Sequence, residues 1–171
     1  MTHAERQAFL INSGIAELLG FSHWKTEEQK EATKFVFDLS TEKWVGNRNE
    51  SQLIESPHWR PIEAAIRELD GKSRTLVTLG ADDETYMSIG GGKGGKYIVT
   101  VTFDNLNFHV LIEPSKPDET EKLVVGGQEG IYPAKMCVDL LRCLLAARTF
   151  TETGKLEPLL CWEEDKSLVI V

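Results

Sequence analysis

The chain has 171 residues, of which 41% are apolar and 27% are charged, a length and composition that predict one globular domain and disfavour a disordered polypeptide. Its 27 acidic and 19 basic residues give a formal net charge of −8, which disfavours nucleic-acid binding and docking on anionic membranes, because both need a surplus of lysine and arginine. This charge suits a basic protein partner, although many soluble proteins carry a similar charge for solubility alone.

Two amphipathic helices are predicted before residue 40. Over residues 4–19, apolar side chains recur at helical spacing and Gly20 follows as a stop. From Thr26 to Leu39, Thr26 is suited to the N-cap and two glutamates fall in the first turn. We expect no export signal and no membrane span, because the first residues lack an apolar core and no apolar run approaches the length of a span. A cytoplasmic location is therefore expected.

Residues 40–58 are predicted to be a loop, since polar residues, asparagine and glycine dominate them. This loop is the best candidate for an internal boundary. We therefore divide the chain into a helical N-terminal extension over residues 1–55 and an α+β domain over residues 56–171, and we expect the two to pack as one compact unit. A short helix is predicted over residues 61–69, with Pro61 at its first position.

Beyond residue 70 the apolar pattern changes to a period of two residues, which predicts β-strands. In one such run, Tyr97, Val99, Val101 and Phe103 face one way while Thr100 and Thr102 face the other. Short links between successive strands favour an antiparallel meander. The predicted strands cover residues 75–79, 85–89, 96–103, 107–113 and 122–125.

A long helix is predicted from Pro133 to Phe150, because leucine, valine, alanine and cysteine cover most of its surface. So broad an apolar surface implies burial against the sheet. A short strand is expected at residues 159–162, and residues 168–171 are expected to form an edge strand or a loose tail. The fold class is therefore α+β, with N-terminal helices and an antiparallel β-sheet meander packed against one long C-terminal helix.

The cysteines and histidines show no pattern of a metal site or a disulfide framework. Cys137, Cys143 and Cys161 are odd in number and form no C-x-x-C pair, which disfavours a secreted disulfide-rich protein. The four histidines lack the spacing of zinc ligands, so we expect no metal and no cofactor. Since His109 could meet a cysteine in the folded chain, an enzyme that uses such a pair remains an alternative.

Residues 90–95 have the sequence GGGKGG, which formally matches the G-x-G-x-x-G pattern of nucleotide-binding loops. That chemistry needs a helix N-terminus directly after the glycines. Here the β-branched run from Tyr97 to Val101 predicts a strand instead, and no serine or threonine follows Lys93. We therefore interpret the segment as a flexible β-hairpin loop, in which glycine adopts positive φ at little steric cost.

An acidic cluster of Asp82, Asp83 and Glu84 falls between two predicted strands. A calcium loop would place its oxygen ligands at alternating positions around a glycine, and this spacing is absent. The cluster is therefore interpreted as a solvated turn that can also form part of an anionic binding surface.

A second acidic cluster follows Trp162, at the end of a short apolar run. An aromatic anchor beside exposed charge is a composition that suits a protein interface, and the alternative is a tryptophan that closes the core beside a polar turn. Our candidate contacts with a protein partner combine both clusters with the lysine of the glycine loop. They are Asp82, Asp83, Glu84, Lys93, Glu163, Glu164 and Asp165.

Seven segments beyond residue 65 form an ordered pattern, namely IRELDGK at 66–72, LVTLG at 76–80, GGGKGG at 90–95, VGGQ at 125–128, YPA at 132–134, AARTFTETG at 146–154 and LLCWE at 159–163. In this order they resemble the immunity proteins of bacterial polymorphic toxin systems, specifically the family catalogued first among them, immunity family one. The resemblance covers the region from Trp59 to Trp162. Residues 1–55 carry no signal of that family.

The resemblance implies a stoichiometric inhibitor that is made beside a secreted or contact-delivered toxin and protects the producing cell and its kin in interbacterial competition. Similar proteins often accompany nucleic-acid deaminase toxins, and others accompany different toxin classes. The implied partner is a cognate toxin domain, with no catalytic residues and no cofactor in the inhibitor, which is expected to be a monomer or a homodimer. A small-molecule-binding or regulatory α+β domain is the alternative, and a structural role is another.

Overall fold

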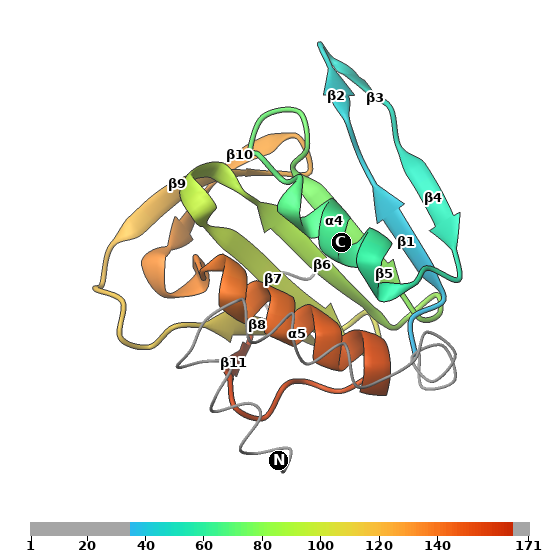
Figure 1. Ribbon diagram of the computed structural model, residues 1–171. Coiled ribbons are helices and arrows are strands. Elements are labelled where there is room, and N and C mark those ends of the chain that lie inside the picture. Colours follow the sequence, from blue (N-terminus) through green and yellow to red (C-terminus); the bar gives the residue numbers. More distant parts are fainter. Residues whose placement is uncertain (1–34, 166–171) are drawn as a thin grey trace.

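The computed structural model describes residues 35–165, and the account below refers to those residues (Figure 1). One layer is an antiparallel sheet, and helices α4 and α5 cover one of its faces. The predicted helix over 4–19 and the predicted strand or tail at 168–171 lie outside the described residues. In chain order the elements are β1 (Asp38–Thr41), β2 (Trp44–Val45), β3 (Arg48–Asn49), β4 (Gln52–Glu55), α4 (Trp59–Arg67), β5 (Leu76–Gly80), β6 (Tyr86–Gly91), a 3-10 turn (Lys93–Gly95), β7 (Tyr97–Thr102), β8 (Phe108–Ile112), β9 (Thr120–Val125), β10 (Gln128–Pro133), a second 3-10 turn (Ala134–Met136), α5 (Leu140–Thr153) and β11 (Cys161–Glu164).

The main sheet has seven strands in the order β11-β8-β7-β6-β5-β1-β4, and every neighbouring pair is antiparallel. Strands β5 to β8 follow one another as a meander. β1 lies between β4 and β5, since Ser40 pairs with Leu53 on one side and with Thr78 on the other. β11 returns along β8 and closes the opposite edge. These elements confirm the predicted α+β class and the antiparallel meander.

Helix α4 begins two residues before the predicted helix and places Pro61 at its third position. Proline is tolerated there because the N–H groups of a helix's first turn have no intrahelical acceptor. Ile62 and Ile66, one turn apart, are fully buried. The chain then turns back to β5 through a loop in which the Asp70 carboxylate accepts hydrogen bonds from the backbone N–H groups of residues 72–74.

The main core lies between the helices and the sheet. Along β7, Val99 and Val101 are fully buried beneath the helices, and Thr100 between them faces the other way because side chains alternate along a strand. Helix α5 contributes Leu144 and Phe150, which are also fully buried. The predicted period-two pattern thus marks the residues of β7 that the helices cover, except Phe103, which follows the end of the strand and is exposed.

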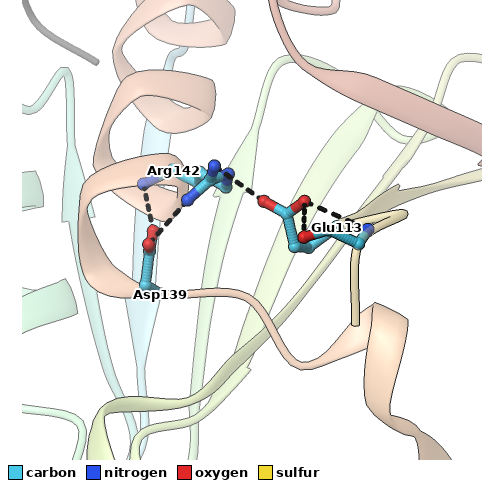
Figure 2. Close-up of polar contacts among 4 residues, drawn as sticks. Glu113, Asp139 and Arg142 are labelled. Atoms are coloured by element: carbon cyan, nitrogen blue, oxygen red, sulfur yellow. Dashed lines mark hydrogen bonds and ion pairs between the residues drawn. The ribbon is translucent and has the colours of Figure 1, made fainter. Parts of the chain in front are cut away.

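The first turn of α5 is fastened to the end of β8. Asp139 is the N-cap, and its carboxylate accepts a hydrogen bond from the backbone N–H of Arg142 at 2.9 Å. The Arg142 guanidinium bridges Asp139 and Glu113, with N···O distances of 2.7 Å to each (Figure 2). The Glu113 carboxylate also accepts a hydrogen bond from the Ser115 hydroxyl at 2.8 Å. At its other end the helix stops at Gly154, whose φ of +72° favours glycine.

We expect the substitution Glu113→Gln to lower the free energy of unfolding by about 1 kcal/mol at pH 7, because it removes the charge that Arg142 binds. Hydrogen bonds from Ser115, together with the nearby Arg142 guanidinium, hold the pKa of Glu113 below its ordinary value. A carboxyl group with a lowered folded-state pKa stabilises the protein above its unfolded-state pKa of about 4.3, and this contribution is lost as the pH falls through the folded-state value. Urea unfolding should therefore show a difference between wild type and variant at pH 7 that shrinks at pH 3. A difference of equal size at both pH values would contradict this assignment.

The hairpin β9–β10 packs on the face of the sheet that the helices leave free (Figure 1). Gly90 permits the close approach of β9, since a Cβ atom there would lie 2.4 Å from the Val125 side chain. The hairpin covers part of this face, and we call the remainder the open face. Between hairpin and sheet lies a second buried cluster, made of Ile98, Val110, Ile112, Leu123, Met136 and Cys137.

The predictions for the segment before α4 are wrong where the structure describes it. The predicted helix from Thr26 to Leu39 enters the described residues at Phe35, and β1 begins at Asp38 within it. The predicted loop over 40–58 contains the end of β1, the β2–β3 hairpin and β4. Here the pairing of β1 with β4 and β5 outweighs the helical spacing of the apolar residues. The division at residue 55 stays a prediction, and residues 38–55 contribute β1 and β4 to the main sheet.

Three further corrections concern the C-terminal half. The predicted helix from Pro133 to Phe150 begins too early, because β10 ends at Pro133 in an extended conformation (φ −55°, ψ 137°) and α5 begins after the N-cap Asp139. The predicted strand at 122–125 is part of β9, which pairs with β10 and not with the meander. The strand expected at 159–162 lies two residues further along, as β11.

Candidate functional site

Five of the seven candidate contact residues lie at one end of the main sheet, together with Asp104. The strand register brings their segments together, since Tyr86 pairs with Thr102 and Thr102 pairs with Phe108. The backbone N–H of Asp165 donates to the carbonyl oxygen of Phe108 at 2.8 Å. Neighbouring strands are about 4.8 Å apart, so the segments from β6 to β11 span about 15 Å. We call this surface the acidic end, made of Asp82, Asp83, Glu84, Asp104, Glu164 and Asp165.

Local hydrogen bonds keep two carboxylates of the acidic end ionised. The backbone N–H groups two and three residues further on donate to Asp82 and lower the pKa of its carboxyl. Hydrogen bonds from the backbone N–H groups of Asn107 and Leu106 hold the pKa of the Asp104 carboxyl well below its usual range. Residues 76–92, 97–115 and 156–165, which contain the acidic end, carry no lysine or arginine. This surface therefore presents negative charge throughout the physiological pH range.

The other two candidate residues lie elsewhere. Lys93 belongs to the β6–β7 loop, at the opposite end of the strands. Glu163 lies on β11 and pairs with Lys135, whose Nζ is 3.0 Å from both carboxylate oxygens. Asp104, the remaining member of the acidic end, was not among the candidate contact residues. The signal for it was the meander itself, because alternate turns of a meander lie at the same end of the sheet.

A groove of about 330 Å³ lies on the open face beside the β9–β10 hairpin. Its lining is mostly apolar, with a few hydroxyl groups, which is typical of binding sites. Strands β5 to β8 supply one side of the lining, and β9 and β10 supply Val125 and Tyr132. The lining residues are Leu76, Tyr86, Ser88, Gly90, Ile98, Thr100, Asn105, Phe108, Val125 and Tyr132.

The groove reaches the acidic end through Tyr86, Asn105 and Phe108. The Tyr86 hydroxyl donates to the Asn105 side-chain oxygen at 2.8 Å, and its ring lies edge-on to that of Phe108 with centroids 6.4 Å apart. Asn105 directly follows Asp104, and the Phe108 carbonyl binds the backbone of Asp165. An apolar hollow thus opens beside ionised carboxylates, a combination that the sequence did not reveal because its lining comes from six strands.

The glycine-rich loop over 90–95 joins β6 to β7 and leads into a strand, not into the helix that a nucleotide-binding loop requires. Gly92 has a φ of +104° and lies against Leu69, since a Cβ atom there would be 2.5 Å from the Leu69 carbonyl carbon and oxygen. Gly94 also has a positive φ, +66°, but has no neighbour within 4 Å of its Cβ position. The interpretation as a hairpin loop is confirmed, and the loop packs against the α4–β5 turn.

The cysteines and His109 do not form an arrangement that favours nucleophilic chemistry. Burial raises the pKa of Cys137 and of Cys143, which disfavours the reactive thiolate, whereas Cys161 is exposed. The His109 ring packs against Phe103 with ring centroids 5.7 Å apart. Within the part of the chain that the structure describes, no three histidine, cysteine or acidic side chains are grouped to hold a metal ion. In the same part, no helix has the length and apolar character needed to cross a bilayer.

One family model matches the chain over residues 53–164, and its description is Immunity protein Imm1. The match covers about two thirds of the sequence and runs from β4 to the end of β11, so it includes both described helices, the groove and nearly all of the acidic end. Searches of curated proteins and of solved structures found no match.

Proposed function

The chain belongs to the Imm1 family of immunity proteins, and from this premise we propose that it binds a cognate bacterial toxin and neutralises it by covering the toxin's active site or substrate-binding surface. The observation that carries the proposal is the family match, which spans the whole meander and both described helices. A secreted or contact-delivered toxin that enters the cytoplasm is the proposed target, and one-to-one binding is the proposed mode of inhibition.

The acidic end supports a basic toxin surface as the binding partner. Its carboxylates lie on exposed turns and on the end of an edge strand, where a partner can reach them. A toxin that acts on nucleic acid, such as a deaminase, needs a basic groove to bind phosphates. Carboxylates of the acidic end, placed where the phosphates of the nucleic acid would bind, would fill the toxin's basic groove. Their long-range attraction would also raise the association rate. Lys93, at the opposite end of the sheet, is not part of this proposed surface.

The direct test is titration of the toxin domain encoded beside this chain's gene. We expect a one-to-one complex, loss of toxin activity at equimolar inhibitor, and survival of cells that express both proteins. The absence of a complex and of inhibition at micromolar concentrations of both proteins would contradict the proposal.

We expect the double substitution Asp83→Lys/Glu84→Lys to lower the association rate constant for the toxin by about 10- to 100-fold at low salt, because it reverses charge at the acidic end. The Asp82 carboxylate that orders this turn stays in place. The salt dependence of the association rate should also become shallower. Stopped-flow or surface-binding kinetics at several salt concentrations measure both quantities.

The matched control is Glu119→Lys/Glu129→Lys, which changes the net charge equally at exposed positions around the β9–β10 hairpin. We expect this control to change the association rate far less. Equal effects of both double substitutions would indicate that net charge alone governs the encounter and that the acidic end has no special role.

A further inference from the structure

We propose that the groove on the open face is the socket for one large apolar side chain of the toxin, and that a lysine or arginine beside that side chain binds the acidic end. This inference rests on the proposed function and assigns the part of the surface that would anchor the complex. Its occupant is thus a segment of a protein in which an aromatic or aliphatic residue is flanked by positive charge.

The shape of the groove supports a single inserted side chain. Its volume of about 330 Å³ lies near the lower end of the ~300–1,000 Å³ range of small-ligand pockets, which leaves room for one or two side chains and little more. Ser88, Ile98 and Thr100 line it from β6 and β7, two strands that have hydrogen-bonded neighbours on both sides. A socket on such strands is rigid before the partner arrives, so little conformational entropy is lost on binding.

The polarity of the groove walls favours an apolar occupant. The Tyr86 hydroxyl already donates to Asn105, so this end of the groove presents mainly ring surface from Tyr86 and Phe108. Large anchors that fill such pockets supply most of the affinity in protein interfaces, and tryptophan, tyrosine and arginine are enriched among them.

The negative charge at the mouth of the groove favours a basic residue next to the inserted side chain. Three residues that line the groove lie next to carboxylates of the acidic end. Asn105 follows Asp104 in the sequence, and the carbonyl oxygen of Phe108 accepts a hydrogen bond from the backbone N–H of Asp165. Tyr86 is two residues after Glu84. Backbone hydrogen bonds keep the Asp104 carboxylate ionised. An anionic metabolite would be repelled at this mouth, whereas a basic side chain next to the anchor would meet several carboxylates.

The experiment fills the groove and measures binding of the toxin domain encoded beside the gene. Ser88 is half-buried, and Ser88→Phe places a ring in the groove. We expect this substitution to raise the dissociation constant of the complex at least ~30-fold, the factor that corresponds to loss of a hot-spot contact. Ser40→Phe is the matched control, because Ser40 lies on the same face two strands away and outside the groove lining. We expect the control to change affinity less than about 3-fold.

Circular dichroism and urea unfolding establish that each variant is folded. Ser88→Leu introduces a smaller side chain and is the test if Ser88→Phe does not fold. A folded Ser88 variant that binds the toxin as tightly as the wild-type protein does would overturn the socket and leave the proposed function intact. Failure of the wild-type protein itself to bind would overturn the proposed function, and the socket with it. A small molecule that copurifies with the wild-type protein and is lost in the folded Ser88 variant would also overturn the socket, because it would identify the groove as a metabolite pocket.

Discussion

Replacing Phe150 with alanine should lower the free energy of unfolding by about 3–5 kcal/mol, the range observed when a large buried aromatic side chain is truncated. Phe150 is fully buried in the last turns of α5, within the core between the helices and the sheet. Its ring meets that of Phe35 edge-on, with centroids 5.8 Å apart. The truncation therefore removes apolar burial and an aromatic contact together, and leaves a cavity where α5 approaches the start of β1.

Phe37→Ala is the matched control for this prediction, because it removes the same side chain from a position that is 59% exposed. We expect the control to cost less than about 1 kcal/mol. Urea unfolding followed by circular dichroism gives both values, and similar m-values would show that the variants unfold from the same compact state. Comparable losses for the two variants would indicate that Phe150 is not at the centre of the core.

Gly92→Ala is expected to destabilise the protein by about 2–5 kcal/mol, the sum of a strained backbone and a steric overlap. The φ of Gly92 is +104°, which an alanine adopts only at a cost. The added methyl group would also lie 2.5 Å from the Leu69 carbonyl group, which belongs to the backbone and cannot rotate away. The α4–β5 turn and the glycine loop would have to move apart.

Gly94→Ala separates the two contributions. Gly94 also has a positive φ, but its Cβ position is open, so we expect a loss of only about 1–2 kcal/mol. Thermal unfolding of both variants at the same pH measures the difference. If the two substitutions cost the same, the contact with Leu69 has no energetic weight and the conformation of the loop alone explains its glycines.

The parts of the fold that were predicted correctly are those whose pattern is local. The alternation of Tyr97, Val99 and Val101 marks a strand with one buried face, and Ile62 and Ile66 mark the buried side of α4. The strands that were missed, β1 and β4, are only four residues long and have too few residues to show a period, so their pairing with each other and the pairing of β1 with β5 determine them. β10 was missed because Gln128–Pro133 is rich in residues that are rare in strands, and only its pairing with β9 holds it extended.

For the candidate site, the sequence predicted individual residues but not how they come together. The sequence indicated Asp82–Glu84 and Glu163–Asp165 as two separate acidic clusters, and the register of β6, β7, β8 and β11 is what joins most of them at one end. Asp104 joins them through the same register. The groove had no sequence signal, because its walls arise where the β9–β10 hairpin is laid across the sheet, and no local pattern determines where a hairpin packs.

The position of β1 has a consequence for how the molecule is delimited. The family match begins at residue 53, within β4, yet β4 is hydrogen-bonded in the main sheet only to β1, which lies upstream of the match. A polypeptide cut to the matched residues would leave β4 without a neighbour and would expose the edge of β5. The segment matched by the family and the seven-stranded sheet therefore have different borders, and a piece of the chain that keeps the whole sheet has to include β1, which begins at Asp38.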